Sequence, residues 1–192
     1  MGVPTIKTGP MTVEEFYAFT DARPDEEKWE LIDGEPVLNA SPSELHQRII
    51  KNLVVSLAAL EGRPGMSWEM LPGLGVRVSD ASRPEPDVLI IPTNGKSSDA
   101  QGRDRSDAIV TFEVLSPSTA SRDLRWKRTA YASLPTLKYY VVIAQDAVDV
   151  VVFSRENGFA ERRLRSLDES IELPSLGISV KLAEIYRNTE LK

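Results

Sequence analysis

The sequence predicts a single α/β or α+β domain, for three reasons. Its 192 residues suit one domain with a full hydrophobic core. Segments with helical and strand periodicity follow in the order helix, β-hairpin, helix, strand-rich core, helix and β-hairpin. No internal repeat, low-complexity tract or interdomain linker interrupts this order. We therefore expect one domain over residues 1–192, with its core between about residues 11 and 166.

Helix signals dominate the first third of the chain. Thr12-Val13-Glu14-Glu15 is a capping-box pattern, which predicts a short helix ending near Phe19. The strands on either side of Asp33-Gly34 are expected to form a hairpin with a two-residue turn. A longer helix is predicted to begin at Ser41-Pro42-Ser43 and to end at Gly62. Its apolar residues recur at spacings of three and four: Leu45, Ile49, Ile50, Leu53, Val54, Leu57 and Leu60.

Strand signals dominate the middle of the chain. Trp68–Leu71 and Gly75–Val78 are short strand-like runs that we expect to pair with each other. Asp87–Ile91 and Ala108–Leu115 are almost wholly apolar, which is typical of central strands covered on both faces. The segment 93–107 between them is rich in Gly, Ser, Asp and Arg and is expected to be a mobile loop.

The last part of the chain is predicted to contain a helix, a hairpin and a final short helix. Ser116-Pro117-Ser118 is expected to end the second apolar strand. The elements expected after it are a helix over about Ser121–Ser133, strands at Lys138–Ala144, Ala147–Phe153 and Phe159–Leu164, and a helix at Leu182–Arg187.

Composition narrows the class of protein. With no cysteine and a single histidine, the chain excludes disulfides, thiolate metal sites and zinc sites built from several of its own histidines. No apolar run is long enough to span a bilayer, and Met1–Pro10 lacks the basic and apolar regions of a secretory signal. We therefore expect a cytoplasmic protein with no membrane association.

Charge is a weak guide to the partner. The net charge of −6 argues against broad, passive binding of nucleic acid, which usually requires an excess of Lys and Arg. It does not exclude an enzyme that meets DNA through a local basic patch, because a metal site itself adds acidic residues to the total.

Three residues carry the main functional hypothesis. Asp87 begins one apolar run, Glu113 stands near the end of the other, and Lys127 follows in the next helix. Carboxylates at the ends of otherwise buried strands are costly unless something pairs with them. If the two strands are neighbours, these groups form a minimal set for metal-dependent hydrolysis of a phosphodiester. The alternative is structural: Asp87 caps a strand or turn, and Glu113 pairs with Lys127 in the interior.

A hard divalent cation would suit these ligands. Mg²⁺ or Mn²⁺ favours oxygen ligands, and Mg²⁺ keeps several waters, so that one or two carboxylates often suffice. The side chains of Glu113 and Leu115 point to one side of their strand, and the carbonyl oxygen of Val114 between them is a candidate further ligand. Lys127 would hold or activate the attacking water, or neutralise charge on the phosphate.

The helix that follows contributes further candidates. Asp123, Lys127 and Tyr131 are spaced by four and share one stripe. Arginines beside this stripe and in the preceding loop form a candidate phosphate-contacting surface: Arg122, Arg125, Arg128, Arg103 and Arg105. The alternative is an ordinary solvated helix face.

Several strings of residues occur together from about Met11 to Phe153: Glu113-Val114-Leu115-Ser116-Pro117-Ser118-Thr119 with Asp123, Lys127 and Tyr131, then Tyr139-Tyr140-Val141-Val142, Trp29-Glu30-Leu31-Ile32-Asp33-Gly34-Glu35, Ser41-Pro42-Ser43 with His46, and Pro86-Asp87. Together they resemble the Uma-type family of restriction-endonuclease-like proteins, within the PD-(D/E)xK nuclease superfamily. The first string is specific, whereas Pro-Asp alone would be weak. The resemblance implies a central mixed β-sheet flanked by helices and a Mg²⁺-type site.

Carried over by position, the resemblance makes Asp87 and Glu113 metal ligands, together with the carbonyl of Val114. It makes Glu30 an upstream acidic residue that helps to bind metal, although an exposed cross-strand charge is an equally good interpretation. His46 matches a recurrent helix residue of unassigned role, and an ordinary hydrogen-bonding histidine is the favoured alternative.

The lysine of the wider motif normally stands two residues after the glutamate, where this chain has Leu115. The resemblance implies that Lys127 in the following helix replaces it. Asp123, Tyr131 and His46 would then contact the metal ligands and not the metal itself. For Tyr131 the alternative is packing, which is the more frequent role of a tyrosine.

The leading hypothesis is therefore a metal-dependent endonuclease that hydrolyses DNA, with two copies acting as a homodimer. The alternative is a nuclease-fold module with weak or no catalysis and a regulatory or protein-interaction role, which Leu115 and the acidic net charge favour. A third interpretation is a dimeric structural protein whose interface is formed by Lys138–Ala144 and Ala147–Phe153.

Overall fold

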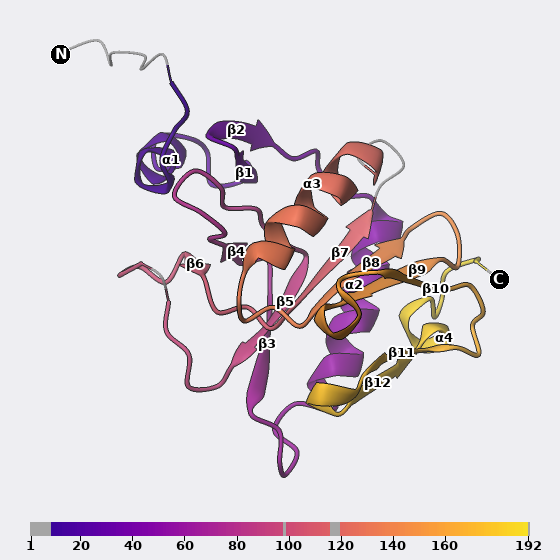
Figure 1. Ribbon diagram of the computed structural model, residues 1–192. Helices are drawn as coiled ribbons and strands as arrows, with labels where there is room; N and C mark the ends of the chain where they lie inside the picture. Colours follow the sequence, from indigo (N-terminus) through magenta and orange to yellow (C-terminus); the bar gives the residue numbers. More distant parts are fainter. Residues whose placement is uncertain (1–8, 98, 116–119, 192) are drawn as a thin grey trace.

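The structure is a computed structural model that describes residues 9–97, 99–115 and 120–191, with the side chains of 120–123 outside the description. The predicted α/β domain, with helices around a central mixed sheet, is confirmed (Figure 1). Its helices are α1 (Val13–Thr20), α2 (Glu44–Ala58), α3 (Ala120–Ser133) and α4 (Leu182–Ile185). Its strands are β1 (Trp29–Ile32), β2 (Glu35–Leu38), β3 (Trp68–Pro72), β4 (Gly75–Val76), β5 (Val88–Pro92), β6 (Asp104–Arg105), β7 (Val110–Leu115), β8 (Tyr139–Ala144), β9 (Val150–Ser154), β10 (Glu161–Leu164), β11 (Ser170–Leu173) and β12 (Ile178–Lys181).

The central sheet has six strands in the order β10-β9-β8-β7-β5-β3. Only β7 and β8 are parallel, and every other neighbouring pair is antiparallel. The two apolar runs of the sequence become β5 and β7, which lie side by side in the middle of the sheet. The N-terminal end of β5 therefore meets the C-terminal end of β7.

Helices cover both faces of this sheet, which explains why its central strands are apolar throughout (Figure 1). On one face, α2 packs through Ile49 and Leu53 against alternate strand residues such as Phe112. On the other face, α3 packs through Tyr131 against residues such as Tyr140. Since successive strand residues point to opposite faces, Glu113 faces α3 while Phe112 faces α2.

A smaller unit beside the sheet contains α1 and the hairpin β1–β2. The predicted capping box is present, with Thr12 and Glu15 exchanging hydrogen bonds at the start of α1. The predicted hairpin also forms, and its turn has φ of 49° at Asp33 and 83° at Gly34. A two-residue turn with both φ values positive favours glycine and tolerates Asp.

Two predictions about the middle strands are wrong. Gly75–Val78 does not pair with Trp68–Leu71: β3 pairs with β5, and the short strand β4 pairs in parallel with β6. The segment 93–107 is not a plain loop, because it contains β6, whose Asp104 and Arg105 are buried. The predicted strand end at Ser116-Pro117-Ser118 lies outside the described residues.

The C-terminal part contributes more to the core than expected. The hairpin β11–β12 was not predicted, yet it packs under α2 together with α4, so the core extends past residue 166. The predicted strands β8, β9 and β10 form, but β8 and β9 lie inside the sheet. Their burial within one chain contradicts the interpretation that they form a dimer interface. Within the described part of the chain, no helix is long and apolar enough to cross a membrane.

Candidate active site

The candidate site lies where β5 begins and β7 ends. The antiparallel register pairs Val88 with Phe112, so one further step along it brings Asp87 opposite Glu113. Opposite residues in an antiparallel pair place their side chains on the same face, within a few ångströms of each other. Residues separated by 26 positions in the sequence therefore converge because of strand topology alone.

Asp87, Val114 and His46 are joined by hydrogen bonds. The backbone N–H of Val114 donates to Asp87 Oδ2 over 2.7 Å. The carbonyl of Val114 lies 2.9 Å from His46 Nε2, which must carry the proton because a carbonyl oxygen only accepts. His46 Nε2 is also 3.6 Å from Asp87 Oδ2. Burial raises the pKa of Asp87, against the opposing effects of His46 and of the Val114 N–H.

Glu113, Lys127 and Glu30 form a second, deeper group. Lys127 Nζ lies 3.0 and 3.1 Å from the two carboxylate oxygens of Glu113 and 2.9 Å from Glu30 Oε1. The hydroxyl of Tyr131 donates to Glu113 Oε1 over 2.9 Å. Lys127 and Tyr131 thus reach one carboxylate from the same stripe of α3.

The environment of this group perturbs its protonation. Burial raises the pKa of Glu113 to about 8, although the neighbouring Lys127 opposes the shift. Burial alone would lower the pKa of Lys127, but Glu113 and Glu30 raise it well above its usual value. Burial and the charge of Glu113 raise the pKa of Tyr131, which stays a hydrogen-bond donor. Lys127 is therefore a fixed cation over the physiological pH range.

Glu30 is placed by the hairpin rather than exposed on it. It is buried on β1, and its Oε1 also accepts the backbone N–H of Glu85 over 2.7 Å. The hairpin is tied to α3 a second time, because Trp126 Nε1 donates to Asp33 Oδ2 over 2.7 Å. The contacts of Glu30 with Lys127 and of Asp33 with Trp126 hold α3 over the end of β7. The cross-strand surface charge considered as an alternative for Glu30 is excluded by its burial.

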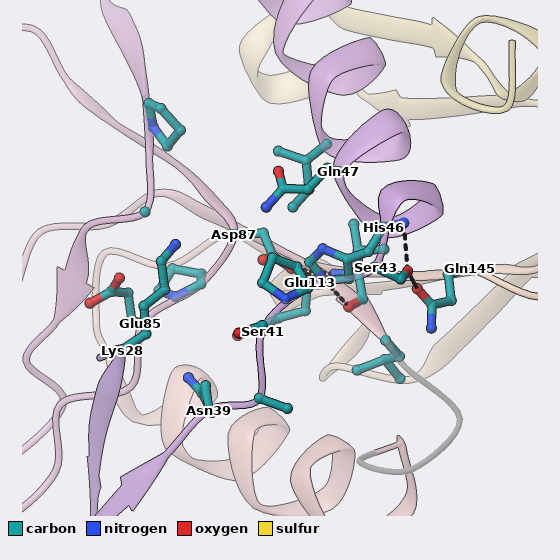
Figure 2. A pocket seen from close by; sticks show the side chains of 18 of the residues that line it. Lys28, Asn39, Ser41, Ser43, His46, Gln47, Glu85, Asp87, Glu113 and Gln145 are labelled. Atoms are coloured by element: carbon teal, nitrogen blue, oxygen red, sulfur yellow. Dashed lines mark hydrogen bonds and ion pairs between the residues drawn. The ribbon is translucent and has the colours of Figure 1, made fainter. Parts of the chain in front are cut away.

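These residues surround one pocket of about 540 Å³ (Figure 2). Figure 2 shows Asp87 and Glu113 at its centre, with Lys28 and Glu85 to one side and His46 to the other. The pocket is lined by Lys28, Glu30, Asn39, Ala40, Ser41, Pro42, Ser43, His46, Gln47, Ile50, Pro72, Gly73, Glu85, Pro86, Asp87, Glu113, Val114, Leu115, Lys127 and Gln145. The wall residues Lys28, Asn39, Gln47 and Gln145 were not predicted, because they lie in loops and at a helix start without any motif.

Of the predicted arginine surface, the described side chains of Arg103, Arg105, Arg125 and Arg128 do not line this pocket. The guanidinium of Arg128 donates to the carbonyl of Phe159 and lies over the ring of Phe153. Arg103 and Arg105 are bound to acidic neighbours and do not line the pocket. Arg125 is exposed and is not part of the lining. The side chains of Arg122 and Asp123 lie outside the described residues.

The donor set fits a hard divalent cation. Asp87 accepts a hydrogen bond from a described residue through Oδ2, which leaves Oδ1 for an ion. The Val114 carbonyl accepts one hydrogen bond and keeps a second lone pair. Three acidic side chains, those of Glu30, Asp87 and Glu113, face the single ammonium of Lys127. In the described part of the chain, no three Asp, Glu or His side chains are grouped to share one ion. An ion here would therefore rely on two carboxylates, one carbonyl and water.

The fold and this pocket define a mixed α/β protein of the nuclease-like class. Among solved structures, the chain is similar to one described as "a putative nuclease belonging to DUF820" from Anabaena variabilis, with a TM-score of 0.75 and 16% identity over 92% of this chain and 98% of that one. A family model described as "Putative restriction endonuclease", Uma2, matches residues 13–183. The chain belongs to this family, as its motifs predicted. No curated protein matches it.

Proposed function

We propose that this protein is a metal-dependent endonuclease that hydrolyses phosphodiester bonds in DNA. The observation that carries the proposal is the convergence of Asp87 and Glu113 from neighbouring strand ends, beside the ammonium of Lys127, in one open pocket. Carboxylates with raised pKa values in a cleft are frequent in active sites, although structural ion pairs also produce them. Membership of a family described as "Putative restriction endonuclease" supports the first of these interpretations.

Mg²⁺ or Mn²⁺ would be held by Asp87, Glu113 and the carbonyl of Val114, and Glu30 would assist a second ion. A bound ion would shield the phosphate charge and promote ionisation of the attacking water. His46 would orient the carbonyl ligand through its Nε2–H bond to Val114. Tyr131 would hold the Glu113 carboxylate through its hydroxyl.

Lys127 would act as a hydrogen-bond donor and not as a base. Its pKa is raised well above the usual value by Glu113 and Glu30 against the effect of burial, so it does not release a proton near neutral pH. An ammonium group has three N–H donors. It would orient the attacking water and stabilise negative charge that develops on the phosphate.

Substitution of the two carboxylates tests the proposal. Asp87→Ala and Glu113→Ala should abolish DNA cleavage and Mn²⁺ binding while circular dichroism shows an intact fold. Asp146→Ala, at an exposed position outside the pocket, is the matched control. Cleavage at the wild-type rate in both site variants would show that the activity resides elsewhere.

The alternative function is tested by the same measurements. Calorimetry that detects Mn²⁺ binding, with no cleavage of any DNA, would identify a nuclease-fold module with a regulatory or interaction role. The departure at Leu115 is the observation that favours it. We further propose that the protein forms a homodimer, which light scattering measures, and that it resides in the cytoplasm.

A further inference from the structure

The charged groups of the site lie at the floor of the pocket. The side chains of Glu30, Glu113 and Lys127 are only 4, 7 and 8% exposed, and that of Asp87 is 22% exposed. A phosphodiester that reaches them must therefore enter the pocket together with the sugar and base attached to it. The volume of about 540 Å³ falls in the range of pockets that enclose one small-molecule ligand, and a nucleotide is a ligand of this size.

Besides Lys28 and Glu85, the walls above this floor carry uncharged polar side chains that offer hydrogen bonds. Figure 2 shows Gln47 and Asn39 on opposite sides of the two carboxylates. Within the described residues, neither of their amide side chains has a hydrogen-bond partner, so both are available to a ligand. Ile50, Pro72 and Pro86 add apolar surface to the lining of the pocket. Amides read base edges and apolar side chains pack on base faces.

The rest of the surface is poorly suited to a duplex. Non-specific binding of duplex DNA depends on several Lys and Arg contacts to phosphates. Of the two lysines in the pocket, Lys127 is held by Glu30 and Glu113, and only Lys28 is in no ion pair with a described residue. Many of the arginines are neutralised within the chain by a neighbouring carboxylate: Arg48, Arg77, Arg83, Arg103, Arg105 and Arg163.

We propose that this pocket receives an unpaired nucleotide, so that the preferred substrate is single-stranded DNA. This inference rests on the proposed nuclease function and specifies its substrate. In an intact duplex each base is paired and stacked, and extracting one is costly. An unpaired strand places one base between Gln47 and Asn39 and the adjoining phosphate near Asp87 and Glu113. It needs few phosphate contacts outside the pocket.

The test compares one labelled DNA strand, alone and annealed to its complement, with Mn²⁺ present. The single strand should be cleaved at least about tenfold faster than the duplex, because the duplex must first be unpaired. Gln47→Ala and Asn39→Ala should each raise KM for the single strand about fivefold, as expected for one lost hydrogen bond, and leave kcat nearly unchanged. Gln101→Ala and Asn157→Ala, exposed residues outside the pocket, are matched controls that should change neither.

Each outcome separates the inference from the proposed function. If the duplex is cleaved as fast as the single strand, the protein is a nuclease but the substrate inference is wrong. Unchanged KM in both Gln47→Ala and Asn39→Ala would also overturn it. If nothing is cleaved, the proposed function fails. Fluorescence anisotropy of the same two DNAs then tests the substrate inference by binding alone. Tighter binding of the single strand, weakened by the two pocket substitutions, supports the inference, whereas equal binding or none refutes it.

Discussion

Replacing Lys127 with methionine should destabilise the folded protein strongly and in a pH-dependent way. Methionine keeps the length of the side chain, so the change removes an ammonium without opening a large cavity. Glu30 and Glu113 then remain buried, and among the described residues they keep the N–H of Glu85 and the hydroxyl of Tyr131 as hydrogen-bond donors. Removing one partner of a buried ion pair typically costs about 3–5 kcal/mol. We expect a loss in this range in the free energy of unfolding at about pH 9.

The loss should shrink as the pH falls. Burial already raises the pKa of Glu113 to about 8, and removal of the ammonium raises it further. Below about pH 8 the Glu113 carboxyl is mostly protonated in both proteins, so it has no charge to leave uncompensated. Only the contribution of Glu30 remains there, and we expect about half of the loss at about pH 6. The difference between wild type and variant therefore grows as the pH rises through about 8.

Urea unfolding followed by tryptophan fluorescence at the two pH values measures this difference. Lys51→Met is the matched control, because Lys51 is exposed on α2 and its loss leaves no buried charge. Adding Glu113→Gln to Lys127→Met should recover much of the stability at the higher pH, since the amide carries no charge. A loss below about 1 kcal/mol, the size expected of an exposed pair, would refute the reasoning. So would a loss that is the same at both pH values.

Three further predictions concern buried groups. Tyr17→Phe removes the hydroxyl that donates to the buried carboxylate of Asp104 and should cost about 1–3 kcal/mol in urea unfolding; a neutral result would mean that water replaces the hydroxyl. Asn52→Ala removes two hydrogen bonds from α2 to carbonyls of the C-terminal segment and should cost about 2 kcal/mol while speeding proteolysis there; unchanged proteolysis would contradict this. Mn²⁺ binding at neutral pH should release a proton, because burial raises the pKa of Glu113 to about 8 and a ligand must be ionised; calorimetry in two buffers of different ionisation enthalpy measures it, and identical heats would exclude it.

Local patterns were sufficient to predict the elements that form the site. The run from Asp87 to Ile91 and the run from Ala108 to Leu115 are too apolar to be anything but central strands, and two such strands tend to be neighbours. Spacing by four placed Lys127 and Tyr131 on one stripe, and both contact Glu113. The roles of these groups in metal binding and hydrolysis stay predictions.

Long-range strand pairing and burial could not be predicted from the sequence. Gly75–Val76 pairs with Asp104–Arg105, a partner segment so polar that no strand signal marks it. The two strands of the hairpin β11–β12 alternate polar and apolar residues but have only four residues each, so their place under α2 depends on tertiary contacts. The contacts of the described arginines were also beyond what spacing predicts. Spacing along a helix does not predict that the guanidinium of Arg128 donates a hydrogen bond to the carbonyl of Phe159.

The position of the lysine has a geometric explanation. Leu115 stands where the wider motif has its lysine, and it shares with Glu113 the face of β7 that α3 covers. Because α3 lies over this face, a side chain from the helix can reach the carboxylate as well as one from the strand can. Lys127 does so, with Nζ 3.0 Å from Glu113 Oε1, while Leu115 packs into the apolar cluster between sheet and helix. The helical origin also brings the ammonium within 2.9 Å of Glu30, which ties its position to the β1–β2 hairpin. Because Lys127 comes from α3, its ammonium contacts Glu113 and Glu30 together and joins the hairpin to the site.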